Sequence, residues 1–553
     1  MKARSNPNIA SALSSMAQSM PDETAIYYPK SRSPDGTWHY DSMTYGELDS
    51  ESTRLAAGLG EVGITAGTRA VLMVKPSMEF FALTFALFKA AIVPVMVDPG
   101  MGIKNLKTCL QEAQPQAFIG IPKAHVARIL LRWGSETIEH KVTVGRRWFW
   151  GGFTLDQVRE KGEAIDFQAP GVDPSDTAAL LFTSGSTGVP KGAVYNHGNF
   201  SAQVDAIRAT YDITPGEIDL PTFPLFALFD PALGMTTVLP QMDFANPATV
   251  NPRNLVEPIR QFGITNMFGS PAVLERLGRY GEKNEVVLPS LKRVISAGAP
   301  VPSKTLKRVS AMLEGEAEIF TPYGATECLP VASMGSREIL STTAEKTDQG
   351  AGVCIGRPVE GMEVKIIEIV DDPIEEWSEA LEIAQGQVGE FVVKGEQATR
   401  RYFNRDEATR RAKIKDGEEI RHRMGDLGYF DDEGRMWFCG RKSHRVELGD
   451  GTTMFTIQCE GVFNTHPEVF RTALVGVKKA GEVIPVLCVE LEEESQGTPR
   501  QKIREELAEI GSRFDHVSGI DTFFFQSGFP VEVRHNSKIF REELTEWAKS
   551  RLQ

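Results

Sequence analysis

Leu180-Leu-Phe-Thr-Ser-Gly-Ser-Thr-Gly-Val-Pro-Lys-Gly-Ala-Val194 joins two apolar runs through a loop of hydroxyl side chains, glycines and one lysine. The apolar flanks predict two buried strands, which would hold the loop at a sheet edge with its backbone N–H groups and hydroxyls facing an anion. Lys191 is followed by Gly192 instead of Ser or Thr, so the run does not match a Walker-type phosphate loop. An ordinary solvated turn is the alternative, but a hairpin turn needs only about two or three such residues. The stretch therefore predicts a phosphate-binding loop, formed by Thr183, Ser184, Gly185, Ser186, Thr187, Gly188 and Lys191.

Short apolar runs and longer amphipathic stretches alternate on both sides of this loop. Ala70–Val74 and Ile92–Val97 have the composition of buried strands, and Met78–Ala90 between them has that of a helix. The same alternation returns at Ile264–Phe268 and Val294–Ala297. Strands that alternate with helices form parallel sheets, so the fold class is α/β with layered sheets in a large N-terminal domain.

The pattern of predicted secondary structure changes twice toward the C-terminus. A chain of 553 residues exceeds a single hydrophobic core, so more than one domain is expected. Segments rich in strand-forming residues start near Val359, and a region with its own strands and its own charged helix, Arg500–Ile510, follows Lys442. We predict an N-terminal domain over residues 1–441, with a small β-rich subdomain at about 359–441, and a mobile, smaller α+β lid domain over 442–553. Gly440–Arg445 is the predicted linker.

Composition excludes several classes of protein. The 60 Lys+Arg against 74 Asp+Glu give a formal net charge of −14, which disfavours a general nucleic-acid binder. The six cysteines are widely separated and form no CxxC pair, so neither a disulfide framework nor a zinc site is indicated. We expect no signal peptide in the polar first 20 residues and no transmembrane segment later. These features favour a cytoplasmic protein.

Three more motifs follow the loop in order. They are Thr321-Pro-Tyr-Gly-Ala-Thr-Glu327, Met424-Gly-Asp-Leu-Gly428 and Pro530-Val-Glu-Val-Arg-His-Asn-Ser-Lys538. Alone, each has an ordinary explanation: Gly-Asp-Leu occurs in many turns, and Lys538 could be a solvated lysine. In this order after the loop, they resemble the adenylate-forming superfamily of acyl-CoA synthetases, adenylation domains and luciferases, across nearly the whole chain.

The resemblance implies a site for ATP and Mg²⁺. In that family the glycine-rich loop binds the pyrophosphate end of ATP, with Lys191 as a mobile point charge. Tyr323 would stack on adenine beside Gly324, because an aromatic face suits a purine. Thr326 would contact the α-phosphate, and Glu327 would ligate Mg²⁺ as a hard carboxylate, with Thr187 as a second metal ligand.

The remaining ATP contacts come from the later motifs and one earlier segment. Asp426 would accept hydrogen bonds from the ribose hydroxyls, assisted by Arg441. Lys538 would bridge the substrate carboxylate and the α-phosphate, where negative charge builds in the adenylation transition state. The segment Ser296-Ala-Gly-Ala-Pro300 fits the adenine-lining part of the family, which implies roles for Gly298, Ala299 and Pro300; a plain turn after a strand is the alternative.

The acyl-binding segment departs from the family pattern. Relatives commonly carry an aromatic and histidine gate where this chain reads Phe223-Pro-Leu-Phe-Ala-Leu-Phe-Asp-Pro231, with Ala227 at the histidine position. Loss of that ring would widen a cavity lined by Phe226 and Phe229, as a bulky aliphatic acid requires. The alternative is that these phenylalanines are simply core. His197 is a further pocket candidate, although a lone histidine is more often structural.

The linker departs as well. Many relatives have Asp as the hinge and a lysine-containing loop that helps to build the CoA tunnel, whereas this chain has Ser443 as the hinge residue, then Glu447 and Gly449-Asp-Gly451. An acidic loop matches the phosphates of CoA poorly. Together with Ala227, this linker resembles the olefin β-lactone synthetases of bacterial long-chain hydrocarbon biosynthesis.

This finer resemblance implies the reaction. A long-chain 2-alkyl-3-hydroxy acid would be adenylated, and its β-hydroxyl would then displace AMP to close a β-lactone. The alternatives are a long-chain fatty acyl-CoA synthetase or acyl-AMP ligase, and, in another class, a catalytically silent scaffold subunit. The substrate is the expected partner, and a homodimer or an assembly with other enzymes of hydrocarbon synthesis is compatible with the sequence.

One tryptophan-rich segment has two possible explanations. Arg146-Arg-Trp-Phe-Trp150 is either a packed wedge or a docking patch.

Overall fold

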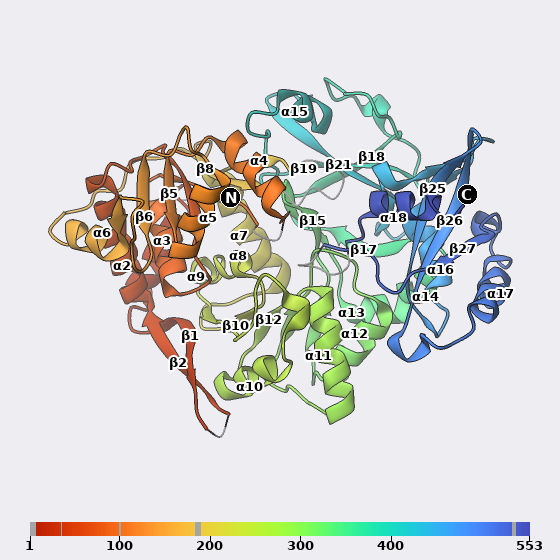
Figure 1. Ribbon diagram of the computed structural model, residues 1–553, viewed down its shortest axis with the longest axis horizontal. Helices are drawn as coiled ribbons and strands as arrows, with labels where there is room; N and C mark the ends of the chain where they lie inside the picture. Colours follow the sequence, from red (N-terminus) through yellow and green to blue (C-terminus); the bar gives the residue numbers. More distant parts are fainter. Residues whose placement is uncertain (1–6, 35, 99–100, 183–189, 533–537, 553) are drawn as a thin grey trace.

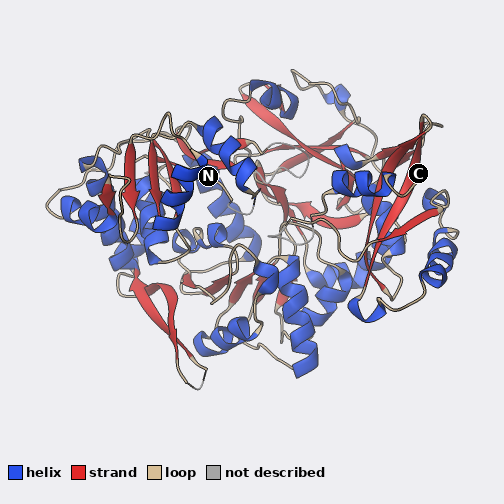
Figure 2. Cartoon of the chain, viewed as in Figure 1, coloured by secondary structure: helices blue, strands red, loops and turns tan. Residues whose placement is uncertain are grey.

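The structure, a computed structural model, describes residues 7–34, 36–98, 101–182, 190–532 and 538–552. Figures 1 and 2 show layered sheets with helices between and outside them in the first part of the chain, a strand-rich middle, and a separate group of strands and helices at the C-terminal end. The α/β fold class predicted from the sequence is confirmed.

The first sheet carries the two strands predicted beside the glycine-rich loop. Its strand order is β7-β6-β5-β3-β4-β8-β9, and all neighbours are parallel except the antiparallel pair β8 and β9. Strand β9 lies at the sheet edge, as expected. The bounds are β3 Arg69–Met73, β4 Val93–Met96, β5 Ala117–Gly120, β6 His140–Thr143, β7 Phe153–Thr154, β8 Thr177–Phe182 and β9 Gly192–Asn196.

The second sheet is also mostly parallel, with the order β14-β13-β12-β10-β11-β1-β2. Its bounds are β1 Thr24–Arg32, β2 Trp38–Thr44, β10 Ile218–Pro221, β11 Thr236–Val238, β12 Asn266–Phe268, β13 Arg293–Ile295 and β14 Glu318–Phe320. The predicted strands at Ile264–Phe268 and Val294–Ala297 are therefore present but shorter. In parallel sheets the carboxyl ends of strands share one edge, which is where ligands of open α/β sheets bind.

Helices fill the space between these two sheets and cover their outer faces. The largest apolar cluster lies between the sheets and draws on α1 Ala10–Ser19, α2 Tyr45–Glu61, α3 Met78–Lys89, α6 Leu155–Gly162, α7 His197–Tyr211, α8 Pro224–Ala227 and α9 Asp230–Leu233. Helices α4 Ile103–Ala113 and α5 Pro122–Leu131 pack on the other face of the first sheet, and α10 Arg253–Phe262, α11 Pro271–Asn284 and α12 Ser303–Ser310 pack on the second.

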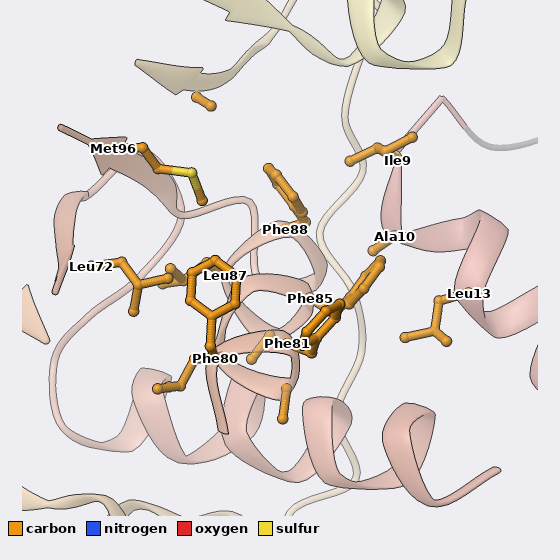
Figure 3. Close-up of a cluster of buried hydrophobic side chains, with 14 of the residues drawn as sticks. Ile9, Ala10, Leu13, Leu72, Phe80, Phe81, Phe85, Leu87, Phe88 and Met96 are labelled. Atoms are coloured by element: carbon orange, nitrogen blue, oxygen red, sulfur yellow. The ribbon is translucent and has the colours of Figure 1, made fainter. Parts of the chain in front are cut away.

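Helix α3 shows how the sequence positions this core. The Ser77 side chain accepts a hydrogen bond from the backbone N–H of Phe80 and so caps the helix N-terminus. The helix is apolar on nearly all sides, and every residue from Phe80 to Lys89 is buried. Figure 3 shows Phe80, Phe81, Phe85 and Phe88 of this helix together with side chains of α1, β3 and β4.

The third sheet is antiparallel and lies over the edge of the first two. Its order is β15-β16-β17-β22-β21-β19-β18, with β20 paired to β21. Its bounds are β15 Tyr323–Ala325, β16 Cys328–Ser333, β17 Val353–Pro358, β18 Glu363–Ile367, β19 Gly389–Lys394, β20 Lys413–Asp416, β21 Glu419–Phe430 and β22 Met436–Arg441. The first strand of this sheet begins at Tyr323, whereas the sequence predicts strand-rich segments only from about Val359. Strands β15 and β16 are too short to show an alternating apolar pattern. Helices α13 Ser336–Glu338, α14 Ala344–Asp348 and α15 Asp406–Ala412 accompany it.

The C-terminal part has its own sheet and core. Strands β25 Val469–Lys479, β26 Glu482–Leu491 and β27 Thr522–Phe525 form a mixed sheet, next to a short pair of β23 Val446–Glu447 and β24 Thr453–Met454. Helices α16 Thr456–Phe463, α17 Arg500–Gly511 and α18 Arg541–Lys549 pack on it. The expected helix Arg500–Ile510 matches α17 to within one residue. The predicted linker is the end of β22 followed by a single 3₁₀ turn, Lys442–His444.

Other sequence expectations can be compared directly. All six cysteines are buried free thiols, as expected. In the tryptophan-rich segment, Trp150 is buried, stacks on His125 and donates to Thr143 Oγ1 at 2.9 Å, whereas Trp148 and Phe149 are exposed. No helix within the described parts of the chain is long and apolar enough to cross a bilayer.

Candidate active site

A cavity of about 1610 Å³ opens among the three large sheets and the C-terminal domain. It gathers predicted site residues that lie hundreds of positions apart in the sequence. Those that line it are Lys191, Phe226, Phe229, Gly298, Tyr323, Gly324, Thr326, Glu327, Arg441, Ser443 and Lys538. The cavity therefore joins the predicted ATP site to the predicted acyl site.

The phosphate-binding end can be described only in part. Thr183, Ser184, Gly185, Ser186, Thr187 and Gly188 lie outside the described residues, so their roles stay predictions. Lys191 directly precedes β9, lines the cavity, and its Nζ lies 5.1 Å from the ring centroid of Tyr402. Strand β9 thus positions Lys191 in the lining of the cavity.

Glu327 is held from both its main chain and its side chain. Its carbonyl oxygen accepts hydrogen bonds from the N–H of Thr399 at 2.8 Å and from Thr399 Oγ1 at 3.1 Å. The Tyr402 hydroxyl donates to Glu327 Oε1 at 2.6 Å. Burial, and then the Glu327 charge, raise the pKa of Tyr402 well above its usual range, so Tyr402 acts as a donor. Glu327 Oε1 is therefore fixed in direction, and the carboxylate is a suitable ligand for a hard cation.

Two further basic side chains, which no sequence motif marks, belong to this region: Lys413 interacts with the Glu327 charge, and His422 is the strand partner of Lys413. Lys413 of β20 is buried and donates to the carbonyl oxygen of Thr399. Its Nζ lies 5.8 Å from the ring centroid of Tyr402. Burial lowers the pKa of Lys413 to about 8, and the charge of Glu327 opposes that shift. His422 of β21 lines the cavity, and burial holds its pKa well below the ordinary value, so it is neutral. Strand pairing, which the sequence does not reveal, brings Lys413 and His422 opposite each other.

The predicted adenine and ribose contacts form one connected unit. The Tyr323 hydroxyl donates to Asp426 Oδ2 at 2.6 Å, and Arg441 Nη1 lies 3.0 Å from Asp426 Oδ1. Asp426 and Arg441 are direct partners in the antiparallel register of β21 and β22. Burial raises the pKa of Asp426, and the Arg441 charge opposes the rise. Asp426 Oδ1 accepts no well-oriented hydrogen bond from the described residues, and the Arg441 guanidinium balances its charge.

The opposite end of the cavity is apolar and aromatic. Phe226 of α8 stacks on Phe268 at a centroid distance of 4.2 Å, and Phe223 and Phe229 lie on either side of it. Further apolar side chains extend this surface deep between the two parallel sheets, including Leu72, Phe85, Phe88, Met96, Tyr211, Leu228, Leu233, Met235 and Leu239. Such a lining suits a long alkyl chain.

Five predicted site residues in the described part of the chain do not line this cavity: His197, Ala227, Ala299, Pro300 and Asp426, which directly follows the lining residue Gly425. Ala227 is fully buried in the apolar cluster beneath the phenylalanines, so its small side chain affects the cavity only through packing. His197 is the first residue of α7; its Nδ1 accepts the N–H of Ile9 at 3.4 Å, and burial lowers its pKa to about 4. Both properties indicate a structural histidine. Ala299 and Pro300 follow Gly298 away from the lining.

The C-terminal domain contributes Lys538. This residue lines the cavity, and its Nζ lies 3.9 Å from Glu532 Oε2, with the lysine side chain 28% exposed. The main-chain N–H of Glu532 donates to the carbonyl oxygen of Lys538 at 2.9 Å, which ties the two ends of that segment together. Ser443 lies in the 3₁₀ turn that links the domains and lines the same cavity.

Among the described residues, no group of three or more His, Cys, Asp and Glu side chains is arranged to hold a metal ion. A single carboxylate such as Glu327 would suit a different kind of site, in which the nucleotide phosphates supply the other ligands of a Mg²⁺ ion.

Comparisons with known proteins agree with this geometry. The family described as AMP-binding enzyme matches residues 13–403. The chain is 51% identical over 547 residues to an olefin beta-lactone synthetase of Xanthomonas campestris pv. campestris, covering 98% of this chain and 97% of that protein. It is 48% identical to a protein of the same name from Stenotrophomonas maltophilia, over 99% of each chain. Among solved structures, the amide bond synthetase McbA from Marinactinospora thermotolerans is similar in fold, with a TM-score of 0.77, 20% identity, and coverage of 98% of this chain and 99% of that one.

Proposed function

The chain belongs to the AMP-binding enzyme family, and we propose that it converts a long-chain 2-alkyl-3-hydroxy acid and ATP into a β-lactone, AMP and pyrophosphate. As its relatives indicate, the chain is an AMP-forming ligase. The β-lactone product is supported by the identity of about half of all positions, along nearly the whole chain, with olefin beta-lactone synthetases. The cavity supports it, because one continuous space runs from Glu327 and Lys191 to the phenylalanines.

The first half-reaction activates the acid. A carboxylate oxygen of the substrate attacks the α-phosphorus of ATP, and the bond to pyrophosphate breaks as pyrophosphate leaves with the electron pair. We assign the pyrophosphate end to Thr183–Gly188 and Lys191, and the ribose to Asp426 and Arg441. The proposal is supported by the connected unit of Tyr323, Asp426 and Arg441 and by the position of Lys191 in the cavity lining.

Lys538 supplies positive charge where negative charge develops. Placed between the carboxylate and the α-phosphate, an ammonium group stabilises the transition state more than the ground state. Lys538 is on the C-terminal domain, so we propose that residues 442–553 act as a lid over residues 1–441, with Ser443 in the hinge. When bound, Mg²⁺ would neutralise the phosphate charge, and Glu327 with Thr187 would hold it.

The second half-reaction closes the ring. The β-hydroxyl oxygen of the acyl-AMP attacks its own carbonyl carbon, forming the lactone C–O bond. The bond between the acyl carbon and the AMP oxygen breaks, AMP leaves with the electron pair, and the hydroxyl proton is released. A strained four-membered ring requires a good leaving group and a held geometry, and a closed apolar pocket supplies the second of these.

The linker supports an internal acceptor in preference to CoA. Arg445 pairs with Asp371 and Glu447, each at 2.9 Å, so its charge is already neutralised. Glu447 is 61% exposed, and Asp450 follows it in the next turn, so this loop carries negative charge, which matches the phosphates of CoA poorly. The alternative, a long-chain acyl-CoA synthetase or acyl-AMP ligase, would use the same residues for the first half-reaction. The cytoplasmic location and an assembly with other hydrocarbon-pathway enzymes stay predictions.

One incubation separates these functions. The purified chain is mixed with a racemic 2-alkyl-3-hydroxy acid, ATP and Mg²⁺, with and without CoA, and AMP and the neutral product are measured. We expect AMP together with a β-lactone in the absence of CoA. Product that forms only with CoA would exclude the lactone function, and absence of substrate-dependent pyrophosphate exchange would favour a silent scaffold.

A further inference from the structure

Three polar side chains interrupt the apolar end of the cavity. Asp219 of β10, Asp230 of α9 and Asn266 of β12, together called the Asp219 cluster, all line it and are each no more than 3% exposed. Asp219 and Asn266 are direct partners in the parallel register of β10 and β12. Burial of two carboxyl groups beside each other is costly, so the cluster requires a physical explanation.

The two carboxyl groups are joined by a hydrogen bond and cannot both ionise cheaply. Burial raises the pKa of Asp219 to about 7, and burial with the Asp219 charge raises that of Asp230 further. Asp230 therefore keeps its proton and donates to Asp219. The other oxygen contacts are also filled: Thr237 Oγ1 donates to Asp230 Oδ2 at 2.7 Å, and the Asn266 amide donates to Asp219 Oδ1. The cation that acts on Asp219, Arg293, is itself paired with Glu217.

Asn266 is the member of the cluster whose side chain has an acceptor without a hydrogen bond from the described residues. Because its NH₂ group donates to Asp219, its carbonyl oxygen Oδ1 points elsewhere. That oxygen is fully buried and accepts no hydrogen bond from any of the described residues. A buried amide oxygen without a donor is destabilising, and a ligand that supplies the donor would remove that cost.

We propose that the Asp219 cluster recognises the hydroxyl group of the acid substrate, which donates its hydrogen to Asn266 Oδ1. The proposal rests on the proposed function, since it concerns the same cavity and the same hydroxy acid. Asp219 and Asp230 act as positioning residues, because the hydrogen bond from the Asn266 NH₂ group to Asp219 leaves Asn266 Oδ1 as the acceptor.

A hydroxyl fits this cluster better than a cation does. The open acceptor is a neutral amide oxygen, whereas the charge of Asp219 is already directed at the Asn266 amide and the Asp230 proton. A site for an ammonium group would direct an ionised carboxylate at the ligand. A saturated acid without the hydroxyl would leave Asn266 Oδ1 buried and unpaired, so such an acid should be rejected.

The test compares two acids of equal chain length, a 2-alkyl-3-hydroxy acid and its 3-deoxy counterpart. Substrate-dependent pyrophosphate exchange measures adenylation of each, and the ratio of the two kcat/KM values is the readout. We expect wild type to favour the hydroxy acid and Asn266→Leu to lower this ratio at least about tenfold, equal to about 1.4 kcal/mol. Asn266→Ala gives the same result if the leucine disturbs β12. A structural defect alone would lower both kcat/KM values and leave their ratio unchanged.

Thr222→Val is the matched control. Thr222 lines the same cavity, but its hydroxyl already donates to the carbonyl oxygen of Phe268 at 2.9 Å, so this variant should keep the wild-type ratio. Equal ratios in wild type and both Asn266 variants would overturn the proposal, as would preference of the wild type for a 3-amino acid over the 3-hydroxy acid. Lactone release is assayed separately: its absence, with the ratio still dependent on Asn266, would reject the lactone function and retain hydroxyl recognition.

Discussion

Replacing Lys538 with alanine should abolish adenylation while the fold persists. The lysine lies on the C-terminal domain but lines the cavity that the N-terminal domain forms. Its described ion pair, with Glu532 at 3.9 Å, is long, and its side chain is 28% exposed. Pairs of this kind contribute at most about 1 kcal/mol to stability, so the midpoint of unfolding should change little.

The expected effect on rate is much larger. A unit charge about 4 Å from the developing negative charge, at an effective dielectric constant of about 20, is worth about 4 kcal/mol. Loss of that interaction in the transition state corresponds to a decrease of about 10³ in kcat/KM. The loss in rate should therefore exceed any loss in stability by several kcal/mol.

The assay is substrate-dependent pyrophosphate exchange at saturating Mg²⁺, with a thermal unfolding curve for each variant. Lys549→Ala is the matched control, because Lys549 is in the same domain, pairs weakly with Glu546 at 4.0 Å, and does not line the cavity. A Lys538→Ala enzyme within about threefold of wild-type kcat/KM would refute the assignment. An equal loss in Lys549→Ala would show that the effect is not specific to the site.

Three further outcomes follow from the buried charges. Glu327→Gln should raise the Mg²⁺ concentration needed for half-maximal pyrophosphate exchange, because the carboxylate charge is lost while the Tyr402 hydroxyl can still donate; unchanged Mg²⁺ titrations would contradict this. Arg541→Met should lower the free energy of unfolding of the C-terminal domain by about 3–5 kcal/mol, since it strands the buried Glu460 carboxylate that Arg541 contacts at 2.5 and 2.9 Å; a denaturant midpoint equal to wild type would exclude that role. The stability of wild type relative to Asp230→Asn should fall as the pH rises from about 4 to about 7, because the folded Asp219–Asp230 pair retains protons that unfolded carboxyls release, whereas the buried neutral histidines, which act in the opposite direction, are common to both proteins; parallel curves of thermal midpoint against pH would refute the linkage.

Much of the site follows from local sequence. The strands beside the glycine-rich loop and helix α3 are where their apolar patterns predict them, because those patterns report burial directly. The motifs that contain Glu327, Asp426 and Lys538 predict the chemistry of ATP use, because phosphate, ribose and metal each require particular residue types close together in the chain.

Contacts between distant segments decided the rest. Tyr402 reaches Glu327 across 75 positions, and Asp219 meets Asn266 across 47, through packing and strand register that no local pattern encodes. Ala227 and His197 look like pocket residues in sequence, yet the packing of α7 and α8 buries both away from the cavity. Residue types and short spacings thus determine that this chain uses ATP to activate an acid. The tertiary structure decides which side chains line the apolar cavity and which buried acceptor has no donor among the described residues. Burial and pairing are properties of the assembled sheets and not of local sequence.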